Sequence, residues 1–127
     1  MGTWGTDIQD NDIYADVESE FLEQLAENKT PKELYKYFIE DSDFNEEISE
    51  ETHDWWFAIA DVFWKIDHLD TRVFLIVKNI IETKADIIYW KDCDADEEDI
   101  QEREEVLKQF LNKISKPIEK PMVYDDF

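Results

Sequence analysis

The most apolar part of the chain is residues 55–64, Trp55-Trp56-Phe57-Ala58-Ile59-Ala60-Asp61-Val62-Phe63-Trp64. Hydrophobic side chains at nearly every position of a helix are typical of a helix that is buried on all sides. A cation-binding cage of tryptophans is the alternative, but aromatic residues at helical spacing usually belong to a core. We therefore expect a buried central helix here, with Ala58 and Ala60 allowing a neighbouring helix to approach closely.

Two amphipathic helices are predicted before this segment. Apolar residues recur from residue 13 to residue 26 at the i, i+4 spacing of a helix. They are Ile13, Val17, Phe21 and Leu25, with Tyr14 and Leu22 beside them. Asp10, Asn11 or Asp12 can cap this helix. Thr30-Pro31-Lys32-Glu33 has the pattern of a capping box with proline at the first helical position, and it predicts a short second helix.

Further helical segments are predicted after the central one. Asp70 is the expected N-cap of a helix over residues 71–83, and residues 85–90 are expected to be helical or irregular. A last helix is predicted over residues 97–115, since its apolar residues follow the helical period. They are Ile100, Leu107, Phe110, Leu111 and Ile114. Residues 40–54 are acidic with few apolar anchors, and we expect a loop or a weak helix there.

Length and glycine content indicate the fold class. The chain has 127 residues, of which 43% are hydrophobic, which suits one domain with a real core. Both glycines lie within the first five residues, and hairpin turns depend on glycine at positive φ. We therefore predict an all-α fold, a compact bundle of about five helices around the aromatic-rich central helix. It forms a single domain over residues 1–127, with an N-terminal motif segment (1–10) and an extended tail (116–127).

The charge balance restricts the partners. The chain carries 34 Asp and Glu against 13 Lys and Arg, which gives a net charge of −21. Nucleic acids and anionic membranes bind proteins through Lys and Arg, so neither is an expected partner. The acidic excess favours a cationic partner, either a basic protein surface or a bound metal. The alternative is that the acidity only maintains solubility.

The acidic residues are unevenly distributed along the chain. Residues 1–60 carry a net charge of −14, residues 61–90 of −1 and residues 91–127 of −6. The candidate partner-binding residues lie in the two acidic parts that flank the nearly neutral middle. They are Glu46, Glu47, Glu50, Glu51, Asp94, Asp96, Glu97 and Glu98. The sequence leaves open whether the two parts form one surface.

Patterns for metal binding and catalysis are incomplete. Residues 92–96 resemble the start of a calcium loop, but the positions that require glycine and a bidentate glutamate hold Glu97 and Arg103. One Glu-x-x-His unit occurs, ending at His53, whereas a di-iron bundle needs two. Cys93 and two distant histidines match no zinc pattern, and the chain has no glycine-rich phosphate loop. We therefore expect no cofactor and no enzymatic activity.

The cell compartment is also suggested by the sequence. A single cysteine excludes an intramolecular disulfide, which favours a reducing compartment. No secretory signal and no apolar run of about 20 residues is visible. The expected location is the cytoplasm.

The N-terminal segment resembles that of a bacterial family of small proteins, domain of unknown function 4259, which begins with a W-G-T-G-x-F-x-[ND]-D-like motif. The corresponding residues here are Gly2-Thr3-Trp4-Gly5-Thr6-Asp7-Ile8-Gln9-Asp10-Asn11-Asp12, followed by Ala15-Asp16-Val17. Later matches follow in the family's order over roughly residues 2 to 112. They are Thr30-Pro31-Lys32-Glu33, Trp56-Phe57-Ala58-Ile59-Ala60, Trp64-Lys65, Leu69-Asp70, Asp86 with Trp90, and Arg103–Leu107.

The chain departs from the family pattern at Asp7 and Gln9, where the family tends to have glycine and phenylalanine. Aspartate tolerates positive φ better than most residues, so a turn at position 7 is still possible, but an aromatic anchor at position 9 is lost. The family has no established activity or catalytic residues. The resemblance implies a bacterial origin and an all-helical fold.

These observations lead to one expectation about function and one alternative. We expect a non-enzymatic protein-binding module, such as an inhibitor or immunity protein that acts on a basic partner, because strong acidity speeds association with cationic surfaces. The alternative is a helical domain with a small-molecule or divalent-metal ligand, whose acidity serves solubility alone.

Overall fold

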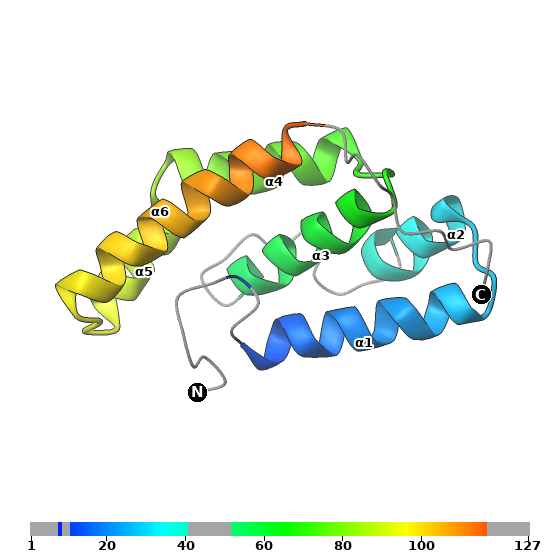
Figure 1. The fold of residues 1–127 in the computed structure, drawn as a ribbon, viewed down its shortest axis with the longest axis horizontal. Coiled ribbons are helices and arrows are strands. Elements are labelled where there is room, and N and C mark those ends of the chain that lie inside the picture. Colours follow the sequence, from blue (N-terminus) through cyan, green and yellow to red (C-terminus); the bar gives the residue numbers. More distant parts are fainter. Residues whose placement is uncertain (1–7, 9–10, 41–51, 117–127) are drawn as a thin grey trace.

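The structure is a computed structural model that describes residue 8, residues 11–40 and residues 52–116. Every regular element within these residues is helical, which confirms the predicted all-α fold. In chain order they are α1 (Asp12–Ala26), α2 (Pro31–Tyr35), the π-helix η1 (Lys36–Glu40), α3 (His53–Lys65), α4 (Thr71–Glu82), α5 (Ala85–Asp92) and α6 (Glu97–Ile114). α1 lies on one side of α3, and α4 and α6 lie on the other (Figure 1).

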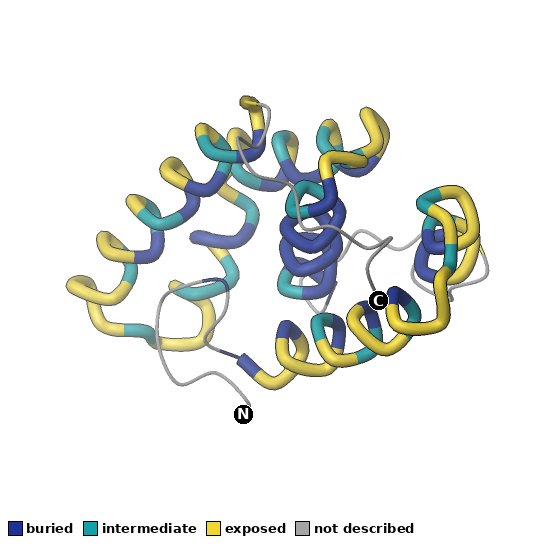
Figure 2. The backbone as a smooth tube through the Cα atoms, turned by 45° about the vertical axis from the view of Figure 1, so that its right-hand side comes forward, coloured by how far each residue is buried: buried dark blue, intermediate teal, exposed yellow. Residues whose placement is uncertain are grey.

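The central helix is α3, as its composition predicts. Ten of its 13 residues are buried, including the small residues Ala58 and Ala60. α1, α4 and α6 all pack against α3, and the burial colouring shows α3 as the most buried helix (Figure 2). Trp55 and Trp56 are buried and Trp64 is partly buried, so these tryptophans belong to the core. The aromatic segment therefore organises the fold by burying apolar area on every side.

A cluster of phenylalanines joins α1, η1 and α3. The Phe21 ring lies 5.3 Å from Phe63 in an edge-on arrangement and 5.7 Å from Phe38. Phe38 in turn meets Phe63 edge-on at 6.4 Å. Aromatic pairs favour such edge-to-face geometry, and each adds a modest stabilisation to the buried area. The cluster attaches the N-terminal helices to α3.

Three helix starts confirm the predicted caps. The Asn11 side chain accepts a hydrogen bond from the Tyr14 backbone N–H at 2.7 Å. Thr30 and Glu33 exchange the two hydrogen bonds of a capping box, and the carboxylate of Asp70 accepts one from the Arg72 backbone N–H at 2.8 Å. Each side chain satisfies a backbone donor that the first helical turn leaves unpaired. Local sequence chemistry thus determines where these helices begin.

The buried row of α1 agrees with the predicted stripe except at its first residue. Val17, Phe21 and Leu25 are buried as predicted, and Tyr14 takes the place of Ile13 in the row. Ile13 is 38% exposed, and Leu22, which was predicted beside the stripe, is 39% exposed. The reason is polar, because the Tyr14 hydroxyl donates a hydrogen bond to a buried carboxylate of α3. This contact places Tyr14, and not Ile13, in the buried row.

The last helix differs from its predicted apolar stripe in two respects. Leu107, Phe110 and Ile114 are buried as expected, but Arg103 joins this row and is 1% exposed. Ile100 and Leu111 are only partly buried. A charged side chain therefore occupies a core position of α6.

Several sequence predictions concern segments outside the described residues. Most of the N-terminal motif (1–10), most of the acidic segment (40–54) and the tail beyond residue 116 lie there. None of the described helices is both long and apolar enough to cross a membrane.

Candidate functional site

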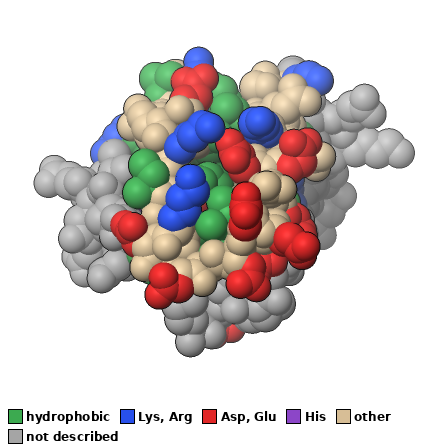
Figure 3. Space-filling view, turned by 90° about the vertical axis from the view of Figure 1, so that its left-hand side faces the viewer, with side chains coloured by type: hydrophobic (Ala, Val, Ile, Leu, Met, Phe, Trp, Pro, Cys, Tyr) green, Lys and Arg blue, Asp and Glu red, His purple; other side chains and the backbone are tan. Residues whose placement is uncertain are grey.

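The predicted partner-binding residues divide into two groups. Glu46, Glu47, Glu50 and Glu51 lie outside the described residues. Asp94, Asp96, Glu97 and Glu98 are all exposed, at the turn from α5 to α6. Figure 3 looks at the end of the molecule with this turn and shows carboxylates around a centre where basic and hydrophobic side chains meet. The turn is therefore an acidic corner of the molecule, next to a region of different character.

A second acidic surface lies on α1, and the sequence prediction did not select it as a site. Five carboxylates follow one another at helical spacing, opposite the buried row. We call Asp12, Asp16, Glu20, Glu23 and Glu27 the acidic face. All are exposed except Glu20, which is partly buried, and α1 contains no Lys or Arg. The i, i+4 and i, i+7 spacing of acids in a helix without bases is the sequence signal for this face.

Exposed apolar side chains accompany the acidic face. Ile13 and Leu22 emerge from α1 itself, and Tyr37 of η1 is 46% exposed. The Tyr37 hydroxyl donates a hydrogen bond to the Glu20 carboxylate, and this bond raises the pKa of Tyr37. Protein interfaces combine aromatic and aliphatic side chains with polar groups around them. The surroundings of the acidic face have this mixed composition.

Helix stability accounts for Asp12, in the first turn of α1, but not for the rest of the acidic face. Carboxylates four residues apart repel each other, and Glu23 and Glu27 lie near the C-terminal end of α1, where the helix dipole disfavours negative charge. Within the described part of the chain, no Lys or Arg forms an ion pair with these two residues, nor with Asp12 or Asp16. These four charges of the face therefore have no basic partner among the described residues, whereas Glu20 is bonded to Tyr37.

A buried cluster around Asp61 sets the orientation of α1. The Asp61 carboxylate, which is fully buried, accepts hydrogen bonds from the Tyr14 hydroxyl at 2.5 Å and from Lys113 Nζ at 2.8 Å. Lys65 Nζ donates to the Tyr14 oxygen at 2.9 Å and lies 3.5 Å from Glu18. Burial and the bond to Asp61 raise the pKa of Tyr14. Tyr14 faces Asp61 and lies in the buried row of α1 with Val17, Phe21 and Leu25, so the opposite side of α1, with its acidic face, points outward.

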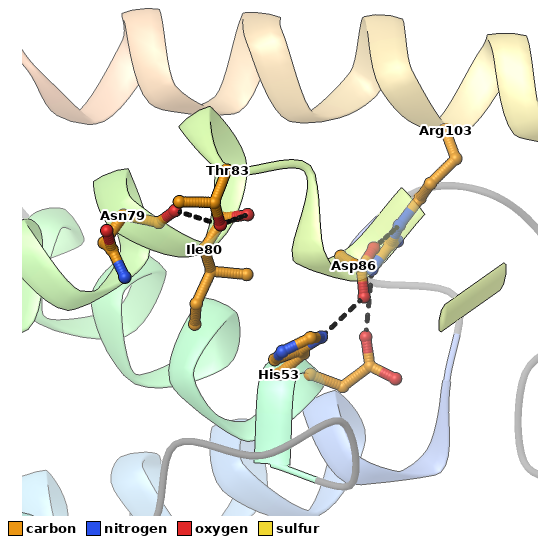
Figure 4. A network of polar contacts seen from close by, with 7 residues as sticks. His53, Asn79, Ile80, Thr83, Asp86 and Arg103 are labelled. Carbon is orange, nitrogen blue, oxygen red and sulfur yellow. Dashed lines mark hydrogen bonds and ion pairs between the residues drawn. The ribbon is translucent and has the colours of Figure 1, made fainter. Parts of the chain in front are cut away.

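A second buried cluster joins α3, α5 and α6. His53, Asp86 and Arg103 point toward one another from these three helices (Figure 4). Arg103 Nε donates to Asp86 Oδ2 at 2.8 Å, and His53 Nδ1 lies 3.2 Å from Asp86 Oδ1. Arg103 also donates to Asp54 Oδ1 at 3.0 Å, and its guanidinium lies 5.0 Å from the centre of the Trp90 ring. The arginine thus connects two carboxylates and an aromatic face.

The two carboxylates of this cluster have opposite pKa shifts. Burial alone would raise the pKa of Asp86, but the hydrogen bonds and charges of His53 and Arg103 outweigh it and hold that pKa below its usual range. Burial raises the pKa of Asp54, because the nearby Arg103 offsets only part of the desolvation. Asp86 is therefore the better satisfied anion of the two.

This second cluster has a structural role. His53, which ends the single Glu-x-x-His unit of the sequence, begins α3, is 4% exposed and contacts Asp86. A substrate cannot reach an imidazole buried in this way, so the His–Asp pair offers no accessible general base. Asp86 and Trp90 of α5 and Arg103 of α6, which carry part of the family resemblance, meet here.

Metal binding gains no support from the described residues, because no group of three or more His, Cys, Asp or Glu side chains there is arranged to hold an ion. Cys93 and His68 are exposed. No model of a known protein family matches this chain, and neither a curated protein nor a solved structure matches it. The resemblance to family 4259 stays a prediction.

Proposed function

We propose that this protein is a non-enzymatic, bacterial protein-binding module whose acidic face engages a basic partner, in the manner of an inhibitor or immunity protein. The observation that carries the proposal is the row of carboxylates on α1, held outward by the Asp61 cluster and bordered by Ile13 and Leu22. The carboxylates would pair with Lys and Arg of the partner, and the aliphatic side chains would add apolar contact at the same surface.

The net charge of the chain supports this proposal kinetically. A net charge of −21 attracts a cationic protein over distances longer than direct contact and raises the association rate at low salt. The same charge repels nucleic acids and anionic membranes. Specific binding then depends on where the carboxylates stand, since net charge alone does not discriminate among basic proteins.

The acidic corner at the α5–α6 turn is a separate surface. It belongs to helices on the other side of α3 from α1 (Figure 1). Asp94 is held at positive φ, and Glu97 and Glu98 lie in the first turn of α6, where the helix dipole favours carboxylates. Local helix stability thus accounts for acids at this corner. We therefore assign partner binding to the acidic face of α1.

The test compares matched variants in a pull-down from a native bacterial lysate at low salt. The face variant carries Asp16→Asn and Glu23→Gln, and the corner variant carries Asp94→Asn and Glu97→Gln, so both lose two negative charges. We expect wild type and the corner variant to retain a basic protein that the face variant retains about tenfold less, as two lost charge-assisted contacts imply. Raising the salt concentration should release it.

Three results would contradict the proposal. One is the recovery of no basic protein at low salt. Another is a partner whose affinity does not change with salt. The third is an equal loss of partner from both variants, which would show that total charge matters and that the acidic face does not.

A further inference from the structure

A groove between α4 and α6 differs in character from the rest of this acidic protein. It has a volume of about 710 Å³, and its apolar walls are Phe74 and Ile81 from α4 and Leu111 from α6. α4 and α6 lie on the opposite side of α3 from α1 (Figure 1). The groove is therefore independent of the acidic face.

Three lysines line this groove. Lys78 belongs to α4, Lys84 to the turn after α4, and Lys108 to α6, and Glu82 is the single acid among the lining residues. Lys84 also pairs with Glu104 at 3.0 Å, which lowers the pKa of that glutamate. Three bases to one acid is the reverse of the whole chain, where acids outnumber bases 34 to 13. The groove thus combines an apolar floor with a cationic rim.

A second hollow extends the groove. It has a volume of about 310 Å³ and shares Phe74 and Ser115 with the first. Trp64, Leu69 and Ile114 add apolar wall beyond the shared residues, and Asp67, Thr71 and Lys116 add polar groups. The two hollows together form an elongated path whose apolar wall starts in the groove with the three lysines. Such a shape suits a ligand with a charged head and a long apolar body.

The net charge of the protein limits how much negative charge a ligand of the groove can carry. Repulsion between the protein and a ligand grows in proportion to the ligand's charge, so a chain at −21 disfavours a nucleic acid or a strongly acidic peptide much more than a single carboxylate. The attraction of a few lysines is local, whereas the repulsion comes from the whole surface. A ligand with one negative charge is attracted by the lysines and is repelled least by the rest of the surface. A large apolar area adds favourable burial in the groove.

We propose that the groove between α4 and α6 binds a long-chain aliphatic monocarboxylate. Its carboxylate accepts hydrogen bonds from the ammonium groups of Lys78, Lys84 and Lys108. Its aliphatic chain lies over Phe74, Ile81 and Leu111 and removes apolar surface from water. The methylene stems of the lysines flank the chain while their charged ends stay at the head group.

The test titrates dodecanoate, below its micelle-forming concentration, into the full-length protein and follows backbone amide shifts and the heat of binding. The groove variant carries Lys78→Gln and Lys108→Gln. The matched control carries Lys32→Gln and Lys36→Gln, two exposed lysines of α2 and η1. We expect the amide shifts to be confined to α4, α6 and the turn after α4 that holds Lys84. Affinity should fall about tenfold or more in the groove variant and stay unchanged in the control.

Chain length and head-group charge give two independent measurements. Each methylene that becomes buried should strengthen binding by about fourfold, so decanoate should bind more weakly than dodecanoate. Dodecyltrimethylammonium carries the opposite charge on the same chain. Its binding in the groove, followed by the amide shifts of α4 and α6, should be at least about tenfold weaker than that of dodecanoate. Both measurements use the wild-type protein and do not depend on how the variants fold.

The proposal is overturned by any of four results. Dodecanoate does not bind, or it binds the groove variant as tightly as the control. The cationic amphiphile binds as tightly as the carboxylate, which would indicate adventitious apolar adsorption. An acidic amphipathic peptide or a second copy of the chain, detected by sedimentation, occupies the groove in preference to dodecanoate.

Discussion

The carboxylates inside this protein and those on the outside of α1 have opposite environments. Asp61 and Asp86 are buried to 0% and 2% exposure, and each is bonded to at least one basic side chain and one further partner. Asp16 and Glu23 stand in water beside other acids. The two buried carboxylates thus have basic partners, although the chain as a whole carries a strongly negative net charge.

The contrast shows which acids the fold needs and which it tolerates. A buried carboxylate without a partner costs several kcal/mol of desolvation, so the core admits an acid only together with its cations. An exposed carboxylate keeps its hydration, and salt screens its repulsion from neighbours. Substitutions in the two regions should therefore differ in size and in sign.

The largest effect is expected from removing Arg103. Arg103→Met leaves the buried Asp86 and the partly buried Asp54 without their arginine partner, and we expect the free energy of unfolding to fall by about 3–5 kcal/mol. The control is Arg72→Met, which changes the only other arginine of the chain, an exposed one, and should cost less than about 1 kcal/mol. Urea denaturation measures both. Equal midpoints for the two variants would refute a structural role for the buried cluster.

A smaller effect on stability is expected from lowering the pH, and it depends on Asp86. Its folded-state pKa lies below its usual range, so its stabilising contribution is complete above the unfolded value of about 3.9 and disappears as pH falls through the folded value. The stability difference between wild type and Asp86→Asn should be constant from pH 7 to about pH 5 and should shrink below pH 4.

Asp54 provides the internal control for this pH dependence. Its pKa is raised, so acidification favours the folded protein at this residue, and the sign of its contribution is opposite. The difference between wild type and Asp54→Asn should therefore move in the stabilising direction for wild type as pH falls. A parallel course for the two variants in chemical denaturation would contradict the assignment of Asp86 as the satisfied anion.

The smallest effect is expected on the acidic face. Asp16→Asn removes a repulsive contact with Asp12 and with Glu20, so we expect a gain in stability of about 0.2–0.5 kcal/mol for each relieved pair at low salt. The gain should vanish in 1 M salt, where charges are screened within about 3 Å. Thermal unfolding at both salt concentrations measures this. A loss of stability would mean that Asp16 has a structural partner.

The helices and their order follow from local rules that the sequence displays directly. Asn11, Thr30 and Asp70 cap the helices that were predicted to begin after them, and α3 coincides with the apolar segment from which the central helix was predicted. A cap bonds to a backbone N–H two or three residues away, and burial on all sides follows from composition alone. Neither depends on distant parts of the chain.

The buried ion pairs and the groove required the packed structure. In the sequence, Asp61 and Arg103 are charged residues within apolar rows. Their partners Lys113 and Asp86 lie on other helices, 52 and 17 residues away in sequence, so the sequence pattern does not reveal these pairs. The burial of Tyr14 in place of Ile13 at the start of α1 depends on the contact between Tyr14 and Asp61. Periodicity reports which side chains are apolar, whereas the partner of a buried charge is set only when separate helices pack together.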